Sequence, residues 1–412
     1  MKILLHMLCF LAYLWGAQED QSERILGLRI NGSRQSNFPV ASLKGNPVTI
    51  SFDVNERPAP DLFLRIYHCD RNWVRTESNF INDQFRTIAK ASLPFTLAPQ
   101  GVEGYQFSYA FRLPGSFGIE QFQYSGNYEF EIVERNVGAI LARGGLFVAE
   151  GSQPVYIQVL NRQLPSEIIP NNQVLKIAVR VDVVHDEANL IDRIPYNLVH
   201  TVDVYKNRNA NSPMRVDVDD KVSDTFVDGF GTPRLTFIID DMLPGNEYRR
   251  LDLSDVDFYP KAKVSRARDG ADVSRNFHAD EKDHDGKSSL LTGTRYADYL
   301  SYTFELLREK EEHDPVYVVG DFSGWRATDK YRMRFDPSSG RYAVTVSLRR
   351  GTYDYEYAFE RGNKIVLEGN DWRTVNVYTA LVYYRDPRLG GYDRIIGFVQ
   401  GRSSGGIEAT SR

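Results

Sequence analysis

Apolar and polar residues alternate along many short stretches of this chain, which is the period of a half-buried β-strand. In residues 127–133, Tyr128, Phe130 and Ile132 would all lie on one face of such a strand. Residues 174–183 alternate in the same way. No amphipathic helical pattern of about 10–15 residues lies between these stretches, which disfavours a parallel α/β fold. The pattern therefore predicts an all-β chain.

The predicted strands fall into three blocks separated by turn residues, which predicts three consecutive immunoglobulin-like β-sandwich domains. We expect these domains at residues 18–150, 151–295 and 296–400. The predicted strands are residues 48–54, 62–68, 106–112, 127–133 and 146–149 in the first block; 174–183, 200–205 and 234–239 in the second; and 298–306, 316–319, 342–348, 353–359 and 377–384 in the third.

Two segments lack this strand pattern. Residues 261–290 are dense in charge and poor in apolar side chains, which predicts a long exposed loop or linker in the second domain. The tail at 401–412 is rich in glycine and serine and is predicted to be disordered.

The N-terminus reads MKILLHMLCFLAYLWGA, with one lysine before an apolar run and small residues at its end. This pattern predicts a secretory signal peptide at residues 1–17, with cleavage after Ala17. An uncleaved N-terminal anchor is the alternative, although the run is short for a membrane span. The chain has two cysteines, and Cys9 lies within this segment. A mature chain therefore keeps Cys69 alone and has no disulfide.

Composition narrows the class of partner. The chain of 412 residues has a hydrophobic content of 42% and a formal net charge of −5. Such a chain can bury sizeable cores. Without a basic excess, nucleic acid is disfavoured as its main partner, because phosphate binding needs clustered lysine and arginine.

The densest cluster of reactive residue types is HCDRNW at 68–73. His68, Cys69 and Asp70 could form a metal or nucleophile site, but no further ligand follows at a recognised spacing. The favoured interpretation is a strand end and a turn, with Trp73 packing over it and Cys69 as a small buried hydrophobe. The run DHDG at 283–286 does not match a calcium loop and is interpreted as a solvated charge run.

No nucleophile elbow, phosphate loop, zinc-protease helix or dinucleotide fingerprint is present in the sequence. We therefore expect no enzyme activity, no cofactor and no metal. In GNEYRRLDLSD at 245–255, Glu247 beside Arg249 or Arg250 is interpreted as a structural ion pair.

Eight segments share an order along the chain that is more specific than any one of them: YHCDRNWVRTESNFIND (67–83), SGNYEFEIVE (125–134), VDVYKNR (202–208), GNEYRRLD (245–252), ADYLSYTFEL (297–306), VYVVGDFSGW (316–325), GTYDYEYAF (351–359) and YTALVYYRDPRLGGYDRIIG (378–397). In this order they resemble the plug protein family of the Bacteroidetes type IX secretion system, formerly a domain of unknown function. The resemblance covers nearly all of the mature chain, except residues 261–290.

The resemblance implies a non-enzymatic periplasmic protein that closes the periplasmic end of a very large outer-membrane β-barrel translocon. It would be peripheral to the outer membrane through that barrel and would need no small-molecule substrate. It also marks a set of signature residues, which we expect to be structural: His68, Cys69, Asp70, Trp73, Ser125, Gly126, Asn127, Tyr128, Asn246, Glu247 and Arg249.

The third block is also similar to glycogen-binding, early-set immunoglobulin-like modules, through GDFSGW at 320–325. In that resemblance Trp325 takes the position that stacks on a sugar. Glu356 or Tyr357 stands where such modules place a lysine, and Lys364 where they place a second tryptophan. The favoured interpretation is a structural turn with Trp325 over the sandwich core. A periplasmic carbohydrate-binding protein is the alternative function.

Overall fold

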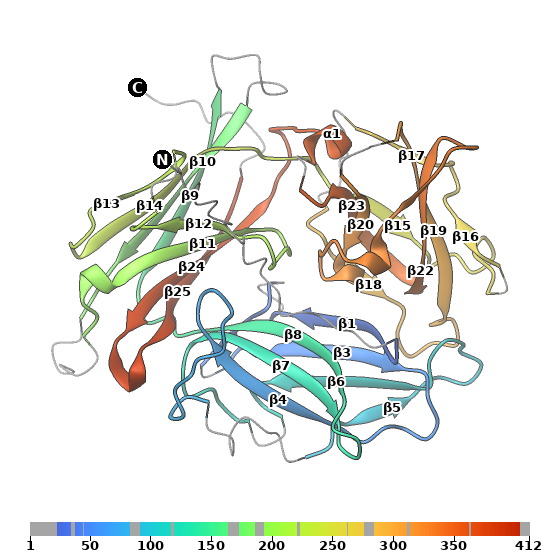
Figure 1. Ribbon diagram of the computed structural model, residues 1–412, viewed down its shortest axis with the longest axis horizontal. Coiled ribbons are helices and arrows are strands. Elements are labelled where there is room, and N and C mark those ends of the chain that lie inside the picture. The colour runs from blue at the N-terminus through green and yellow to red at the C-terminus, as the bar shows by residue number, and fades with distance from the viewer. Residues whose placement is uncertain are drawn as a thin grey trace, which may run out of the picture.

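The protein is almost entirely β-structure, in which strands form several stacked sheets (Figure 1). The computed structural model describes residues 23–33, 38–43, 45–82, 91–116, 119–163, 173–185, 193–220, 223–261, 263–275, 284–310, 314–361 and 364–403. The prediction of an all-β fold built from sandwiches is confirmed. The predicted signal peptide and most of the predicted disordered tail lie outside the described residues.

The first hydrophobic core lies between a four-stranded sheet, in the order β1-β3-β6-β5, and strands β4, β7 and β8. In β6, Phe107, Tyr109, Phe111 and Leu113 are buried, and the residues between them are more exposed. These strands are Ile25–Asn31 (β1), Val40–Ser42 (β2), Val48–Val54 (β3), Leu62–Cys69 (β4), Phe95–Leu97 (β5), Phe107–Leu113 (β6), Gly126–Glu134 (β7) and Ile140–Ala149 (β8).

The middle core lies between the sheet β13-β14-β10-β9 and the strands β12, β11, β24 and β25. Leu175, Ile177, Val179 and Val181 of β10 point into this core, as the alternating sequence predicts. Its strands are Val155–Gln163 (β9), Gln173–Asp182 (β10), Val199–Lys206 (β11), Met214–Asp217 (β12), Thr225–Asp228 (β13), Arg234–Met242 (β14), Val377–Asp386 (β24) and Tyr392–Arg402 (β25).

One expectation about the C-terminus is wrong. We expected residues 377–384 to complete the third sandwich, but β24 pairs antiparallel with β11, and Tyr378, Ala380 and Val382 are buried in the middle core. The chain leaves the middle core after residue 242, builds the third, and then returns. The cores are therefore not consecutive along the chain, and the domain boundaries given above remain a proposal.

The third core lies between the sheet formed by β15, β18, β20 and β23 and the sheet formed by β16, β17, β19, β21 and β22. Its strands are Arg249–Asp252 (β15), Ser265–Arg266 (β16), Asp272–Val273 (β17), Ser288–Leu290 (β18), Tyr299–Leu307 (β19), Val316–Gly320 (β20), Arg334–Asp336 (β21), Arg341–Arg349 (β22) and Gly351–Phe359 (β23). Within the part of the chain that the structure describes, one short α-helix covers Ile365–Glu368 (α1), and 3-10 turns cover Tyr196–Leu198 (η3), Asp321–Ser323 (η4), Asp329–Tyr331 (η5) and Arg388–Gly390 (η6).

The described parts of residues 261–290 differ from the exposed loop that we expected. Both β16 and β17 pair in parallel with β19, and β18 pairs with β23. His284 is also buried. Arg266 of β16 is exposed, but Asp272 of β17 accepts hydrogen bonds from the hydroxyls of Tyr355 and Tyr357, both at 2.7 Å. Local charge density therefore misled the prediction.

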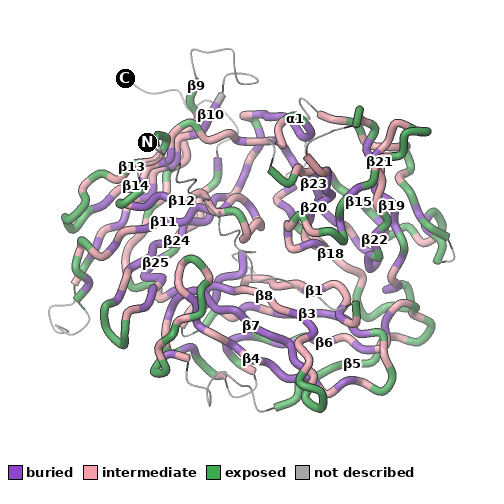
Figure 2. Tube along the Cα trace, in the orientation of Figure 1, coloured by how far each residue is buried: buried purple, intermediate pink, exposed green. Residues whose placement is uncertain are grey.

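A single eight-stranded sheet connects the first and middle cores. Its order is β12-β11-β24-β25-β8-β7-β4, with β2 added beside β8. The connection is made where β25 lies parallel to β8, with Ile395 opposite Ala149. We call this contact the β8/β25 junction. The buried tube segments of Figure 2 continue from one core to the next through it.

An aromatic cluster covers the β8/β25 junction. Phe147 of β8 packs on Phe38, Tyr205 and Trp73, with ring centroids 5.3–5.4 Å apart. Residues from both cores, including Tyr383 and Ile395, complete the cluster.

Among the described residues no helix is long and apolar enough to cross a membrane.

We predict that Phe147→Ala lowers the free energy of unfolding by about 3–5 kcal/mol, because a fully buried ring is lost from the junction. Urea unfolding followed by tryptophan fluorescence measures this change. Phe80→Ala is the control, because Phe80 is 72% exposed and its loss should cost less than about 0.5 kcal/mol. Equal losses in the two variants would contradict this role for the aromatic cluster.

Candidate functional site

The HCDRNW motif ends β4 and turns beside the β8/β25 junction. Asp70 closes the turn, because its Oδ1 accepts hydrogen bonds from the backbone N–H groups of Asn72 and Val74, both at 2.9 Å. Trp73 has a φ of 63° at the end of this turn, and its ring packs on Phe147 and on Gly145. A side chain at position 145 would collide with that ring, so the glycine admits Trp73 to the cluster.

His68 is buried beside the junction and holds two elements together. Its Nε2 lies 2.9 Å from the carbonyl oxygen of Ser125, and its Nδ1 lies 2.8 Å from the hydroxyl of Thr76. A carbonyl can only accept, so the proton of the neutral ring is on Nε2 and Nδ1 accepts from Thr76. Burial lowers the pKa of His68 to about 4, so the ring is neutral at pH 7.

Cys69 is fully buried, and burial raises the pKa of its thiol to about 12. A thiol protonated at neutral pH is a poor nucleophile and a poor metal ligand. Within the described residues no group of three or more His, Cys, Asp or Glu side chains is placed to hold a metal ion. The HCDRNW motif is therefore built as a packed turn in this structure.

The SGNY segment meets the HCDRNW turn from the neighbouring strand. Gly126 has a φ of 141°, and a Cβ there would collide with the His68 ring and lie 2.8 Å from the carbonyl oxygen of Asp393. Asn127 donates to the Asp70 carbonyl at 3.1 Å and accepts from the hydroxyl of Tyr383 at 2.9 Å. Asn127 thereby joins the turn to β24. The Tyr128 hydroxyl donates to the carbonyl of Tyr124 at 2.8 Å.

Buried charges cross the same junction. Arg215 of the middle core binds Asp203 through two hydrogen bonds of 2.7 and 2.8 Å, and it also donates to the carbonyl of Arg71 at 2.9 Å. The backbone N–H of Arg71 donates to Asp393 at 2.8 Å. Asp203 and Asp393 are almost fully buried. Asp203 meets Arg215 within the middle core, because β11 and β12 are neighbouring strands. The contacts of Arg215 with the Arg71 carbonyl and of Asp393 with the Arg71 N–H form only when the two cores hold this relative position.

A chain of ion pairs continues to the hairpin between β24 and β25. Ser125 donates to Glu150 at 2.6 Å, and Arg394 binds Glu150 with two hydrogen bonds of 2.7 and 2.8 Å. Arg394 also reaches Asp386 at 2.9 Å, and Arg388 binds the same carboxylate at 2.6 Å. Burial would raise the pKa of Asp386, but the hydrogen bonds from Arg388 and Arg394 outweigh it and hold the pKa at about 2.

None of the predicted site residues is Glu150, Asp386, Arg388 or Arg394. The two arginines and Asp386 lie in RDPRLGGYDR, where an Asp-Pro-Arg turn before two glycines is a signal for a capped hairpin. Glu150 has no comparable local signal, because its partner is 244 residues away in the sequence.

Asn246, Glu247 and Arg249 lie away from this junction, in and beside the third core. Arg249 binds Glu368 at 3.0 Å, and Asn246 donates to the backbone carbonyl of Glu368 at 2.9 Å. Glu247 accepts from the backbone N–H of His284 at 3.0 Å. Arg249 therefore pairs with Glu368 and, at 3.1 Å, with Asp272, rather than with the neighbouring Glu247 that the sequence suggested.

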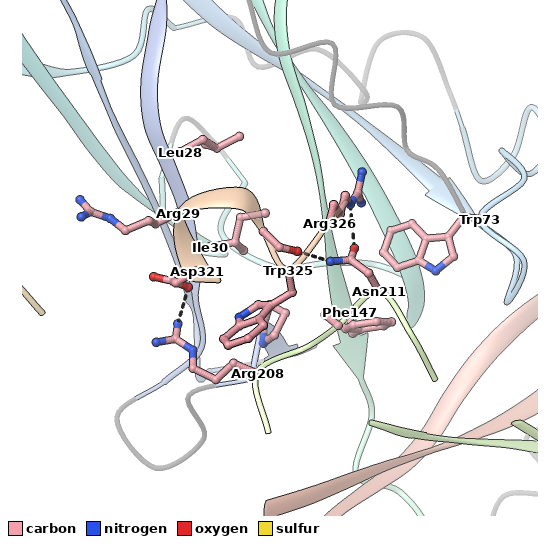
Figure 3. A pocket seen from close by; sticks show the side chains of 14 residues that line it. Leu28, Arg29, Ile30, Trp73, Phe147, Arg208, Asn211, Asp321, Trp325 and Arg326 are labelled. Atoms are coloured by element: carbon pink, nitrogen blue, oxygen red, sulfur yellow. Dashed lines mark hydrogen bonds and ion pairs between the residues drawn. The ribbon is translucent and has the colours of Figure 1, made fainter. Parts of the chain in front are cut away.

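Trp325 of the GDFSGW turn is buried where the three cores meet. The side chain is 6% exposed, its ring packs on Tyr248 at a centroid distance of 4.4 Å, and Gly286 lies against its edge. Trp325 and Trp73 both line a small pocket with Phe147, with Asn211 lying between them in Figure 3. The cavity is about 80 Å³, room for several waters but less than a sugar ring needs.

A model of a known protein family matches part of the chain. Residues 25–148 match the family model of the type 9 secretion system plug protein 1st domain. A crystal structure of a hypothetical protein from Parabacteroides merdae ATCC 43184 is similar, with a TM-score of 0.71 and 20% identity, covering 93% of this chain and 98% of that chain. At this identity the likeness shows a shared fold.

A second similar structure concerns host cell surface retention of a 1.5-MDa bacterial ice-binding adhesin. Its TM-score is 0.15 at 12% identity, covering 93% of this chain and 98% of that chain, and this likeness carries no argument. No protein of curated function matches the chain.

We predict that stability falls on acidification because His68 is neutral when folded. The unfolded histidine takes up a proton near pH 6.5, whereas the folded one does so only near pH 4. Between these values the free energy of unfolding should fall by about 3 kcal/mol through this one group. Urea unfolding at pH 7.5 and pH 4.5 measures the loss.

His68→Gln is the matched variant, because an amide can still donate to the Ser125 carbonyl but does not titrate. Between pH 6.5 and pH 4 the unfolded wild-type protein binds one more proton at position 68 than the folded protein does, and the variant does not. The unfolding free energy of the variant should therefore change less with pH. The same pH dependence in the variant and the wild-type protein would contradict the role of His68.

Proposed function

We propose that this chain, which carries the first domain of type IX secretion plug proteins, closes the periplasmic end of an outer-membrane translocon barrel by protein–protein contact. The observation that carries the proposal is the family match over residues 25–148. The resemblance of the segments between residues 202 and 397 to the same family, with residues 261–290 excepted, supports the proposal beyond that range.

The architecture supports a mechanical role. The first and middle cores share one continuous sheet, and hydrogen bonds between charged side chains and the backbone of Arg71 cross the junction between them. The third core is tied to the first by Arg349, which binds Asp53 at 3.0 Å. A wide, water-filled barrel leaks solutes, and a body that covers its mouth has to keep its shape under contact rather than perform chemistry.

The location follows from the same proposal. Export through the predicted signal peptide would place the mature chain in the periplasm, and contact with the barrel would hold it at the outer membrane. A stable contact of this kind would bury more than about 1,000 Å². Aromatic and arginine side chains are the expected anchors.

The surroundings of Trp325 disfavour the alternative of carbohydrate binding. A sugar-stacking residue has to present one ring face to solvent, and Trp325 is buried against Tyr248 and Gly286. The adjoining cavity is also too small for a hexose.

A conductance measurement tests the proposed plug. The purified translocon barrel is inserted into a planar bilayer, and the mature chain is added on the periplasmic side. We expect the single-channel conductance to fall at least tenfold, because a folded body in the mouth excludes ions. Tight binding without a change in conductance would contradict a plug and leave only an accessory subunit. An absence of binding would contradict the proposed partner.

A further inference from the structure

A groove opens beside the tip of the hairpin between β24 and β25, which lies at the lower left of Figure 1. Its volume is about 470 Å³, far more than the pocket at Trp325. One wall comes from the segment before β7 and the other from the hairpin. The lining residues are Leu43, Gln123, Tyr124, Ser125, Glu150, Arg388, Leu389, Tyr392 and Arg394.

The walls of this groove are fixed by the ion-pair chain described above. Tyr392 is buried and packs edge-on against Tyr124, with ring centroids 5.5 Å apart, and against His68 on its other side. Arg394 is held between Glu150 and Asp386. Such a preformed surface loses little conformational freedom when it binds a partner.

The positive and negative side chains of the groove lie at different depths below the surface. The Asp386 carboxylate is completely buried, and Glu150 is nearly so, whereas the Arg388 side chain that binds Asp386 is 43% exposed. A partner therefore meets the Arg388 guanidinium, while Asp386 lies beneath it and Glu150, which also lines the groove, is paired with Arg394. Arginine and tyrosine on a preformed wall are also the residue types enriched at the centres of protein interfaces.

Leu389 lies at the tip of the hairpin. Its side chain is exposed, at 38%, although it is apolar. Its backbone has φ 54° and ψ 28°, a left-handed conformation that disfavours leucine, although two glycines follow directly. Backbone strain is found preferentially at ligand-contact and active sites, and here it occurs beside the groove.

We propose that this groove docks an extended acidic segment of a protein partner, with a carboxylate on Arg388 and an apolar side chain between Leu389 and Tyr124. The volume accommodates one or two side chains of such a segment, not a folded domain. A basic segment would meet Arg388 with like charge. The inference rests on the proposed function only in taking the partner to be a protein.

The test uses a fluorescent peptide, Glu-Leu-Asp-Leu-Glu with blocked ends, titrated with the mature full-length chain. We expect it to bind at least tenfold more tightly than Gln-Leu-Asn-Leu-Gln, and to weaken as salt rises. Arg388→Gln should remove this preference for the acidic peptide. Equal binding of the two peptides, or binding of neither, would overturn the proposal.

Leu389→Gly separates binding from folding. Glycine relieves the left-handed strain, so the thermal midpoint should not fall, while the affinity for the acidic peptide should drop at least fivefold. Val137→Asn is the control, since Val137 is an exposed apolar residue on the hairpin at the far end of β7, and its affinity should match the wild type. Wild-type affinity in Leu389→Gly would overturn the apolar half of the site.

Conductance distinguishes this proposal from the plug itself. If the wild-type chain blocks the translocon but binds no acidic peptide, the groove proposal is overturned and the plug stands. If it binds the acidic peptide with the expected preference but does not block the translocon, the groove proposal is supported and the plug is overturned.

Discussion

The pairing of β25 with β8 is the constraint on which the rest of this structure depends. It places the C-terminal strands between two cores that the chain built much earlier, so the first and middle sheets become one. The backbone N–H of Glu150 donates to the carbonyl of Ile395 at 2.9 Å, and the aromatic cluster around Phe147 covers the contact. Because β24 and β25 follow the third core in sequence, that core is held at both of its ends.

Buried polar pairs then set the angles between the cores. Between the first and third cores, Asp53 accepts from Arg349 at 3.0 Å and from the Tyr299 hydroxyl at 2.8 Å. Asp298 binds Lys261 and the backbone N–H of Glu103, both at 2.8 Å. Buried ion pairs of this kind add little net stability, because desolvation offsets their attraction. They do make one relative placement of the cores much lower in free energy than slightly different placements, because each displaced pair would leave a buried charge without its partner. Such a fixed geometry suits a protein that works by its shape.

The sequence predicted the long strands well because their signal is local. Strands β3, β7 and β22 fall within a residue or two of the predicted ranges, since alternation over seven or more residues is unambiguous. Short strands such as β16 and β17 were missed because two residues carry no period. The destination of β24 was also missed, because its alternation predicts a strand but does not identify the strand that it pairs with.

The site was predictable only in part, for a related reason. The motifs that contain His68 and Ser125 were visible as signatures, but their meeting at the β8/β25 junction depends on contacts between distant parts of the chain. The groove beside Leu389 was not visible, because a left-handed backbone at leucine cannot be inferred from residue types. The choice of Glu368 over Glu247 as the partner of Arg249 likewise follows from tertiary packing.

Differential scanning calorimetry of the mature chain tests most directly whether the three cores form one body. If β25 joins them as described, the chain unfolds in a single transition whose calorimetric and van't Hoff enthalpies agree. Two or three separate transitions, each with the enthalpy of one core, would contradict the account, because the junction would then not couple the cores.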